Sequence, residues 1–362
     1  MNLGIITFHR ALNYGAILQA YALQQFLLKL DIKNNIIDYR CPYIEHFYKP
    51  IKANIIRQPK SFIKEWLYCV PNTLKRKKFD KFTKKYLFMT EKISHYTDLI
   101  GLNNIFDCFV TGSDQVWNSR WSGFDGAYFL DFAHSNKKNS YAASFGASSI
   151  DEKLIEKYKK YLLAFNFLSV READGVDIIK GLIDKEAVVS IDPTCLLSIE
   201  DWKKVAKPPK EKGYVLLYLL EQSLYLENFA KELAEKNNIK VITITDGLKK
   251  KKGLKQYGFL GPDEFLGLFC NAEYIVTNSF HGLMFSVIFK KQFYLAYQQY
   301  AGAPNSRLKN FIKEYHLERR VLSINQPIFK EDIDYDKIDL MIQEAKEKSK
   351  NYFYKLRESY EQ

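Results

Sequence analysis

A polar cluster with a histidine, residues 277–282, separates two apolar runs in the sequence. The run before it, "YIV", is typical of a short buried strand, and "LMFSVIF" after it is typical of a buried helix. Ser279 and His281 therefore stand where a helix starts, and a helix N-terminus favours anions through its N–H groups and dipole. A hydroxyl and an imidazole there suit an anionic substrate. In the alternative interpretation, Asn278 or Ser279 only caps the helix.

A second polar cluster, "VTGSDQVWN", follows the strand-like run "IFDCFV". It contains Ser113, Asp114 and Gln115, with Trp117 alongside. Polar groups beside an aromatic face suit a sugar ring, whose hydroxyls need hydrogen bonds and whose apolar face stacks on an aromatic ring. A turn with a packing tryptophan explains the same residues, so both interpretations stay open.

A third cluster, "HRALNYGA", follows the first strand-like run. Asn13 and Gly15, on either side of Tyr14, allow a tight turn from strand to helix and a close approach of a ligand to the backbone. The sequence contains neither G-x-G-x-x-G nor G-x-x-x-x-G-K-[ST]. Standard dinucleotide and P-loop sites are therefore disfavoured.

Basic residues stand at two further junctions. "SVREADG" places Arg171 beside Glu172, as an anion contact or as a surface ion pair. "GAPNSRLKNF" offers Arg307 and Lys309 after the strand-like run "QFYLAY". Each is a weak signal by itself.

Strand-like and helix-like segments alternate on both sides of these clusters. In the first half, "LGIITF", a helical pattern over residues 16–30 and "NNIIDYR" predict a β-α-β unit. In the second half, "YVLLYLL", "KVITIT", "YIVT" and "QFYLAY" alternate with helical patterns, one of them capped by Asp263. Two doubly wound α/β halves are therefore expected, with ligands beyond the carboxyl ends of the strands.

The pattern also suggests domain limits. Residues 1–205 form the first predicted domain, with a basic, aromatic, helical insertion at about 43–90. A linker at 204–213, with two prolines and alternating charge, leads to the second domain, residues 206–330. Residues 331–362 are predicted to form a charged amphipathic helix, strongest over 336–360.

Composition limits the partners. The chain has 362 residues and 54 Lys plus Arg against 42 Asp plus Glu, a net charge of +12 that favours anionic partners. Lysine-rich composition from genomic base bias explains the same excess. Five widely spaced cysteines without a C-x-x-C pair are typical of a reducing compartment. With no 18-residue apolar run and no signal-peptide pattern, the chain is expected in the cytoplasm.

Six segments in order carry a resemblance to a known family: "GIITFHRALNYGAILQAYALQ", "VTGSDQVWN", "YAASFG", "VREADGVDII", "DPTCLL" and "VTNSFHGLMFSVIF". Together they closely resemble the polysaccharide pyruvyltransferase family, from Leu3 to about Arg320. The resemblance implies two Rossmann-like domains, arranged as in B-type glycosyltransferases, with the active site in the cleft between them. It also implies transfer of pyruvate from phosphoenolpyruvate to a sugar, with ketal formation and release of phosphate.

The resemblance also implies roles for residues. His281 matches the family's functional histidine, and Arg171 matches the arginine of its "R-E" motif. The residues expected to bind phosphoenolpyruvate are Arg171, Ser279, His281, Arg307 and Lys309. Many members have an arginine where this sequence has Ser279, so Arg307 or Lys309 is expected to supply that charge, or the donor is held differently. Asp114 is a second catalytic candidate. The residues predicted to bind the acceptor sugar are Asn13, Tyr14, Gly15, Ser113, Asp114, Gln115 and Trp117. No metal and no cofactor are expected, phosphoenolpyruvate being the donor substrate.

Two other functions compete with this one. A glycosyltransferase of the same architecture needs an acidic residue on the donor ribose, and the sequence after His281 has no carboxylate before Glu314. The third hypothesis is a non-catalytic carbohydrate- or membrane-binding protein on a retired enzyme fold. The retained polar groups at the strand ends argue against it.

The basic segment at 59–88 predicts a further partner. Capsule and cell-wall sugars are commonly modified on a polyprenyl lipid at the cytosolic membrane face, as the resemblance implies. Aromatic and apolar side chains precede a run of basic ones in this segment, which suits an anionic bilayer. They are Phe62, Trp66, Leu67, Tyr68 and Val70, followed by Lys75, Arg76, Lys77, Lys78, Lys81, Lys84 and Lys85. In the rival interpretation the aromatics are buried in the first domain. No nucleic acid partner is expected.

Overall fold

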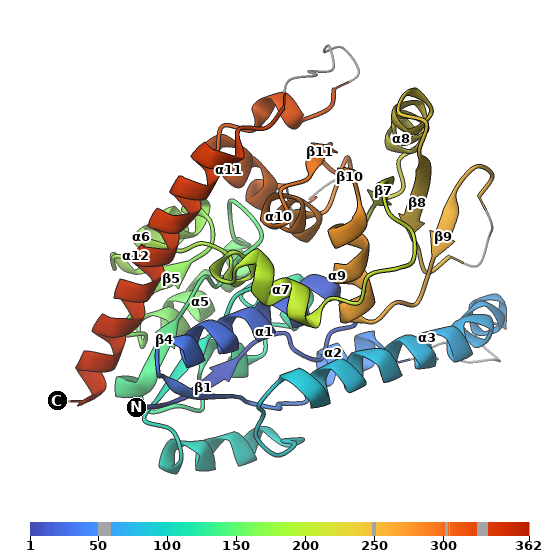
Figure 1. Cartoon of the computed structure of the whole chain (residues 1–362). Helices are drawn as coiled ribbons and strands as arrows, with labels where there is room; N and C mark the ends of the chain where they lie inside the picture. The colour runs from blue at the N-terminus through green and yellow to red at the C-terminus, as the bar shows by residue number, and fades with distance from the viewer. Residues whose placement is uncertain (50–58, 248–250, 301–302, 304, 324–331, 362) are drawn as a thin grey trace. The chain divides into compact units, whose positions relative to one another are not determined.

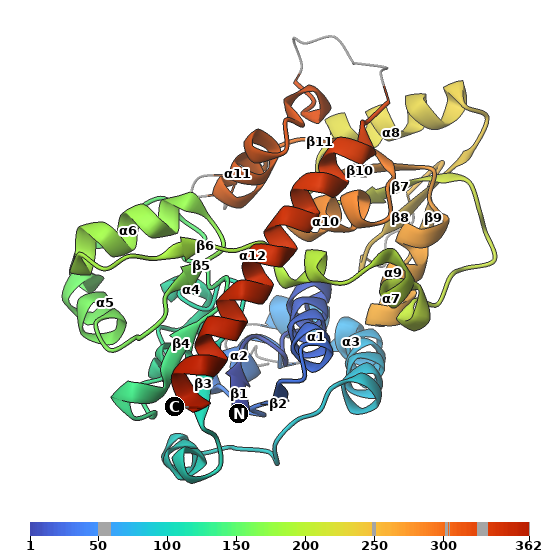
Figure 2. The ribbon, with the colours of Figure 1, turned by 60° about the vertical axis from the view of Figure 1, so that its left-hand side comes forward.

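The computed structural model describes residues 1–49, 59–247, 251–300, 303, 305–323 and 332–361 (Figures 1 and 2). The chain divides into two compact units. Unit 1 consists of Met1–Val70, Thr83–Leu197 and Ile342–Gln362, and unit 2 consists of Pro71–Phe82 and Ser198–Met341. Both are built from parallel strands and helices, as the sequence predicted.

Unit 1 contains a parallel sheet. Its strands are β1 (Asn2–Ile6), β2 (Lys33–Ile36), β3 (Cys108–Thr111), β4 (Lys138–Ser140), β5 (Ser169–Val170) and β6 (Val188–Val189). The pairing order is β2-β1-β3-β4, and β5 pairs with β6. Isolated parallel bridges pair Asn139 of β4 with Phe167, just before β5, and Ala143, just after β4, with Val170 of β5. Bridges from β2 to Met89 and from Tyr39 to Ile93 add one more parallel segment at the β2 edge. The order is therefore that of a doubly wound Rossmann sheet.

The centre of this sheet is apolar on both faces, as expected for buried parallel strands. Every residue of β1 after Asn2 is buried. Gly4 is required there, because a Cβ on it would lie 2.8 Å from the ring of Phe109 in β3. The apolar run "LGIITF" therefore becomes the central strand.

The helices of unit 1 are α1 (Tyr14–Lys29), α2 (Pro42–Phe47), α4 (Ser119–Ser122), α5 (Ile155–Leu162) and α6 (Ala173–Ile183). Its 3₁₀ helices are η1 (Tyr96–Asn104), η2 (Gly126–Phe129), η3 (Ser135–Lys137), η4 (Glu152–Leu154) and η5 (Pro193–Leu196). Most of α1 is buried. Helix α1 packs extensively against η5, which follows β6 in the chain.

Unit 2 contains five parallel strands in the order β11-β10-β7-β8-β9. They are β7 (Tyr214–Tyr218), β8 (Lys240–Ile244), β9 (Lys255–Tyr257), β10 (Tyr274–Thr277) and β11 (Gln292–Leu295). The helices are α7 (Ile199–Val205), α8 (Leu224–Lys236), α9 (Pro262–Asn271), α10 (Phe280–Ile288), α11 (Ser306–Glu314) and η6 (Glu318–Arg320). The order again corresponds to a Rossmann sheet, so the prediction of two Rossmann-like units is confirmed, while the cleft stays a prediction.

Each sheet has one point where the strand order reverses. In unit 1 this switch point lies between β1 and β3, and in unit 2 it lies between β7 and β10. The loops at the carboxyl ends of such strand pairs spread apart, which is why open α/β sheets bind ligands there. The clusters "HRALNYGA", "TGSDQ" and "TNSFHG" all lie at these two points.

The long helix α3 (Pro59–Tyr86) corrects one predicted domain limit. The sequence predicts that the whole insertion at 43–90, part of which lies outside the described residues, belongs to the first domain. Residues Pro71–Phe82 belong instead to unit 2. Lys75 pairs there with Asp246 at 2.7 Å, and Lys78 pairs with Glu264 at 2.6 Å.

The predicted linker and its neighbouring cap are also corrected. Residues 204–213 lie within unit 2 and pack on α9, where the Lys207 N–H donates to the Asp263 carbonyl at 2.8 Å. A Cβ on Gly267 would lie 2.0 Å from the Lys207 carbonyl oxygen, so the contact needs glycine. The N-cap of α9 is Gly261, not Asp263, and its N–H donates to Glu264.

The C-terminal helix α12 (Tyr335–Glu361) forms where the sequence predicted it. This helix does not form a separate part of the fold, because Ile342–Gln362 belong to unit 1. The Tyr141 hydroxyl donates to Ser349 at 2.8 Å, and the buried ring of Phe353 lies 4.8 Å from that of Tyr141. Burial of one face of this helix explains its apolar periodicity.

Candidate active site

At the switch point of unit 2 the chain leaves β10 at Thr277 and enters α10 at Phe280. Ser279 is the N-cap, and its hydroxyl accepts the Gly282 N–H at 3.2 Å. The Thr277 hydroxyl donates to the Tyr218 carbonyl at 2.6 Å, and a Cβ on Gly282 would lie 2.3 Å from that hydroxyl oxygen. Ser279 therefore caps α10, and Gly282 is fixed by close packing.

Asn278 ties together the loops that follow three strands. Its side-chain oxygen accepts the Leu220 N–H at 2.8 Å, and its amide donates to the Glu221 carbonyl at 2.7 Å. Its own carbonyl accepts the Gln298 side-chain amide at 2.8 Å. Asn278 therefore has a structural role: its hydrogen bonds fix the loops after β7 and β11 against the loop after β10. The sequence alone did not predict this role.

His281 and Arg307 both contact the ring of Phe280. The His281 ring meets it edge to face at 5.3 Å, and the Arg307 guanidinium carbon lies 5.3 Å from its centroid. Both side chains are nearly buried. The fold therefore brings Arg307, from α11, to the N-terminus of α10. Lys309 is exposed and lies over the ring of Tyr297 at 5.6 Å, so the structure gives it no such contact with Phe280.

The arrangement in unit 2 suits an anionic group. The first N–H groups of a helix have no carbonyl partner within the helix, and the dipole places positive charge there. An imidazole and a guanidinium lie at the same helix end. Burial raises the pKa of Tyr218, which keeps the hydroxyl beside Ser279 protonated. The nearby carboxylate of Glu221 accepts the Gln299 N–H at 2.8 Å.

At the switch point of unit 1, hydrogen bonds join the loops after β1 and β3. The Thr7 hydroxyl donates to the Ser113 carbonyl at 2.7 Å and accepts the Gln19 side-chain amide at 2.8 Å. The Ser113 hydroxyl donates to Asp192 at 3.2 Å and accepts from Arg171 at 3.3 Å. The loops after β1, β3 and β5 therefore meet in one buried hydrogen-bond network, which also includes Asp192.

Arg171 is surrounded by carboxylates. It donates to Asp192 at 2.7 Å and to Glu172 at 3.3 Å, and it lies 4.0 Å from Asp114. Burial alone would lower the pKa of Arg171, but these three carboxylates raise it. Glu172 also accepts the Ser144 hydroxyl at 2.6 Å. Because the surroundings of Arg171 are negative, its contacts favour a positioning role in unit 1 over a phosphate contact.

Asp114 has a left-handed backbone, with φ of 82°, which is rare for a residue other than glycine. Its Oδ1 accepts the Gln115 N–H at 2.8 Å, and its carbonyl accepts the Ser144 N–H at 3.0 Å. Backbone strain of this kind persists where the surroundings over-determine it, often at functional sites. Asp114 and Arg171 thus lie together, as parts of one constellation in unit 1.

The other predicted acceptor residues have distinct positions. Asn13 is exposed and caps α1, accepting the Ala16 N–H at 3.2 Å, whereas Tyr14 and Gly15 are buried. Gln115 is partly buried, and its side-chain oxygen accepts the Asn118 amide at 3.2 Å. Asn13 therefore acts as a helix cap at the switch point.

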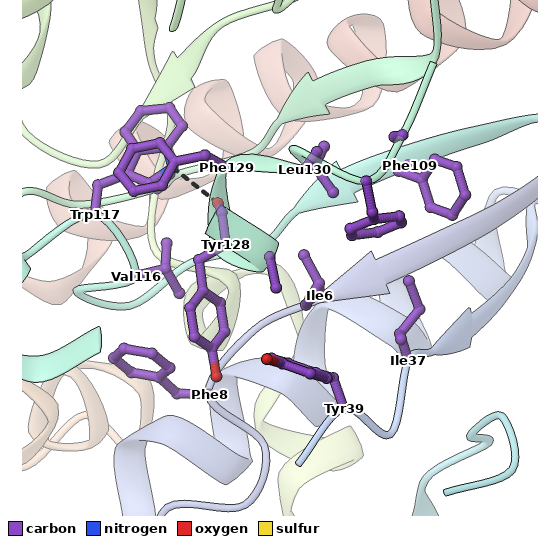
Figure 3. Packing of buried hydrophobic residues seen from close by; sticks show 14 of the residues in the cluster. Ile6, Phe8, Ile37, Tyr39, Phe109, Val116, Trp117, Tyr128, Phe129 and Leu130 are labelled. Carbon is purple, nitrogen blue, oxygen red and sulfur yellow. Dashed lines mark hydrogen bonds between the residues drawn. The ribbon is translucent and has the colours of Figure 1, made fainter. Parts of the chain in front are cut away.

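Trp117 corrects the prediction of a sugar platform. Its side chain is fully buried, its ring is stacked on Phe129 at 6.0 Å, and its Nε1 donates to the Tyr128 carbonyl at 3.1 Å (Figure 3). Phe145 and Phe165 pack against it as well. The tryptophan is a core residue because its ring faces the interior of unit 1, so no sugar stacks on it.

Sequence reasoning missed a charged cluster after β1 and β2. His9 is buried, with Nε2 3.1 Å from Asp38 and Nδ1 3.0 Å from the Thr7 carbonyl. Arg10 and Arg40 also pair with Asp38. Burial raises the pKa of Asp38, but hydrogen bonds from His9 and Arg10 outweigh it and hold that pKa well below its usual range. The signal was present, since "HR" and "DYR" both follow strand-like runs.

The predicted residues therefore form two groups, one in each unit. A separate cavity of about 250 Å³ in unit 2 is lined by the segment around His316 and by the segment that ends at Ile338. None of the predicted site residues lines this cavity.

Within the described ranges, no cluster of three or more His, Cys, Asp or Glu side chains could hold a metal ion. No helix in the described part of the chain is long and apolar enough to cross a membrane.

A model of the polysaccharide pyruvyl transferase family matches residues 13–298 of the chain. The match includes His281, Arg171 and Asp114 and ends before Arg307. No curated protein matches the chain in sequence.

Several solved structures are similar to the chain at low sequence identity. UDP-GlcNAc 2-epimerase from Methanocaldococcus jannaschii is 14% identical, with a TM-score of 0.43 over 95% of this chain and 99% of the epimerase. The corresponding enzyme from Neisseria meningitidis is 8% identical, with a TM-score of 0.44 over 86% and 91%. Heptosyltransferase WaaC from E. coli is 10% identical, with a TM-score of 0.42 over 95% and 100%. The fold assignment rests on the strand order described above.

Proposed function

Because the chain belongs to the polysaccharide pyruvyl transferase family, we propose that it transfers pyruvate from phosphoenolpyruvate to a sugar. The acceptor is a sugar of a cell-surface polysaccharide or of its lipid-linked precursor, and the product is a pyruvate ketal. The observation that carries the proposal is the meeting of His281 and Arg307 on Phe280, where α10 begins. This helix end supplies what an anionic donor needs.

The proposed reaction starts at the methylene carbon of phosphoenolpyruvate. A proton adds to that carbon, and the neighbouring carbon takes on oxocarbenium character. A sugar hydroxyl attacks this centre and loses its proton, and phosphate then leaves with the electrons of the C–O bond. A second hydroxyl attacks the oxocarbenium-like centre so formed and loses its proton, to the departed phosphate or to water, which closes the ketal. His281 supplies the proton or stabilises the departing phosphate, since an imidazole can titrate near neutral pH.

Arg307 is proposed to hold the phosphate or carboxylate of the donor. A guanidinium binds such groups through charge-assisted, often bidentate hydrogen bonds. Arg307 would thus replace the arginine that many family members carry at the position of Ser279. Because Ser279 caps α10 and Lys309 contacts Tyr297, we assign these two residues supporting roles around the donor.

Unit 1 is proposed to bind the acceptor. Asp114 is the candidate base for the attacking hydroxyl, and Ser113, Gln115 and the start of α1 are the candidate sugar contacts. Arg171 would fix Asp114 through their ion pair and Ser113 through its hydrogen bond. We propose that Arg171, although expected from the sequence to bind phosphoenolpyruvate, supports the acceptor site instead, because carboxylates of its own unit surround it.

The proposal includes no metal and no cofactor, since protonation and ketal closure need only acid, base and cation groups. It places the protein in the cytoplasm, where phosphoenolpyruvate is made, in peripheral contact with an anionic membrane. A polyprenyl-linked acceptor would be found there.

The test is an incubation of the protein with phosphoenolpyruvate and a panel of β-galactose, N-acetylmannosamine and glucose acceptors. Free phosphate should rise with one acceptor and not without it, and mass spectrometry of the product should show a ketal. Release of a nucleoside diphosphate from a nucleotide sugar, with phosphoenolpyruvate inert, would indicate a glycosyltransferase instead. Binding of sugar without turnover of either donor would indicate the non-catalytic function.

A further inference from the structure

One face of α3 carries large apolar side chains that are exposed to solvent. Each of them is more than half exposed, and Val70 reaches 68%. Their spacing of three or four residues places them in one row along the helix. They are Ile63, Trp66, Leu67, Val70 and Leu74. A continuous exposed apolar surface of this kind marks an interaction site in a soluble protein.

The same helical row continues with lysines. At the next steps of three or four residues after Leu74 stand Lys77, Lys81 and Lys84, all exposed. The buried side of the helix carries Phe79 and Phe82 instead. One helix face is therefore apolar in its first half and cationic in its second half. We call this row, residues 63–84, the exposed face of α3.

The structure also corrects which basic residues are available for a partner. Lys75 is buried and paired with Asp246, and Lys78 is paired with Glu264. These two lysines stabilise unit 2 and are not part of the exposed face. The predicted membrane segment thus contains fewer contributing cations than its sequence suggests, but they share a face with the exposed apolar residues.

We propose that the exposed face of α3 docks on an anionic lipid bilayer. Apolar side chains would lie at the boundary of headgroups and acyl chains, and the lysine ammonium groups would reach the lipid phosphates. A bilayer accepts both halves of the face. A second copy paired along the whole face would oppose lysines to lysines or to apolar side chains, which disfavours self-association. The biological reason for membrane docking rests on the proposed function, in which the acceptor is lipid-linked. The location of the docking surface rests on the exposed face of α3.

The first test measures co-sedimentation of the full chain with phosphatidylcholine vesicles, with and without added phosphatidylglycerol. The protein should bind the anionic vesicles, and raising the salt should weaken the binding. Equal binding to neutral and anionic vesicles would overturn the proposal.

The second test compares two charge variants that each lose three lysines. The variant Lys77→Gln, Lys81→Gln, Lys84→Gln should bind anionic vesicles roughly 100-fold more weakly, because each lysine near the surface contributes about 1 kcal/mol. The matched control Lys153→Gln, Lys157→Gln, Lys160→Gln removes the same charge from exposed positions of η4 and α5. An equal loss in both variants would mean that net charge, and not this face, drives binding, and would overturn the proposal.

The third test examines the apolar half through Trp66. Trp117 and Trp202 are fully buried, but Trp121 is 42% exposed, so the experiment uses a Trp121→Phe background. In that background a blue shift of fluorescence on vesicle binding should come from Trp66 and disappear when Trp66→Phe is added. The variant Trp66→Ser, Leu67→Ser should bind vesicles roughly 10-fold or more weakly. An exposed apolar residue elsewhere, Leu224→Ser, serves as the control and should bind as the original chain does.

Two further measurements separate lipid binding from self-association and from the proposed reaction. A dimer in sedimentation velocity without lipid that Trp66→Ser abolishes would show that the face binds a second copy, and would overturn the proposal. Phosphate release with a soluble sugar should be the same in the α3 variants as in the original chain. Loss of vesicle binding with phosphate release intact therefore tests the membrane surface separately from the proposed reaction.

Discussion

The two switch points have the same topology and different chemistry. In unit 1 a buried arginine is neutralised by the carboxylates of Glu172 and Asp192, and Asp114 lies beside it. In unit 2 an imidazole and a guanidinium gather at the N-terminus of α10 around Phe280. Two Rossmann sheets with the same strand order thus hold an anionic cluster in one case and a cationic one in the other. The strand order determines where a site forms, and side chains decide which charge it accepts.

The largest expected effect concerns the buried charges of unit 1. Replacing Arg171 with Met leaves carboxylates of Asp192 and Glu172 buried without their cation. The free energy of unfolding should fall by about 3–5 kcal/mol, measured by urea denaturation. Arg171→Lys, which keeps the charge, should lose less. A variant of normal stability whose only defect is a raised KM for phosphoenolpyruvate would return Arg171 to the donor group.

His281→Ala tests the cationic switch point. If His281 takes part in proton transfer or phosphate departure, kcat should fall by roughly 100-fold or more. The thermal midpoint should change little, because the helix cap at Ser279 remains in place. Ser286→Ala, further along α10, is the control for a helix perturbation. A marked loss of stability with kcat unchanged would show that His281 is structural.

The pH dependence of stability tests the cluster around Asp38. Its pKa is lowered in the folded protein, so its contribution is present above the pKa of an unfolded aspartate and is lost as pH falls through the folded value. Asp38→Asn should cost about 2 kcal/mol of unfolding free energy at neutral pH. The difference from the original chain should shrink below about pH 4. A difference that stays constant down to acid pH would contradict the role of the Asp38 charge.

Arg307→Ala should give the smallest of these effects. KM for phosphoenolpyruvate should rise about 10-fold, with kcat and the KM of the sugar nearly unchanged, because a single charge-assisted contact at the weak end of its range is worth about 1.5 kcal/mol. Lys309→Ala, which removes an exposed cation over Tyr297, is the matched control and should change KM less than about twofold. An effect of Arg307→Ala on the sugar alone would place Arg307 with the acceptor.

Local sequence patterns predicted the strands and helices that carry the candidate site. The apolar runs before "TNSFHG" and "TGSDQ" became β10 and β3, and their polar residues lie at the carboxyl ends of those strands. These predictions succeeded because period and turn chemistry act over a few residues.

The failures came from contacts between distant segments. A tryptophan beside polar residues is compatible with a sugar platform, and only the packing of Phe129, Phe145 and Phe165 shows that Trp117 is in the core. Likewise, no residue near Arg171 in the sequence predicts its ion pair with Asp192, which lies in the loop after β6. The prediction of a linker at 204–213 was wrong because prolines indicate irregular backbone, and irregular backbone can pack within a domain as well as between two domains.

The sequence by itself determined the two α/β halves, the family, and the polar residues that follow each strand, because these depend on local periodicity and on motif order. The tertiary structure decided which of those residues share a neighbourhood and which charges they meet there. It neutralised Arg171 with carboxylates and placed Arg307 against Phe280, and it separated the paired Lys75 and Lys78 from the exposed lysines of α3. The physical reason is that charge interactions depend on distance and burial, which side chains acquire only when segments far apart in the chain pack together.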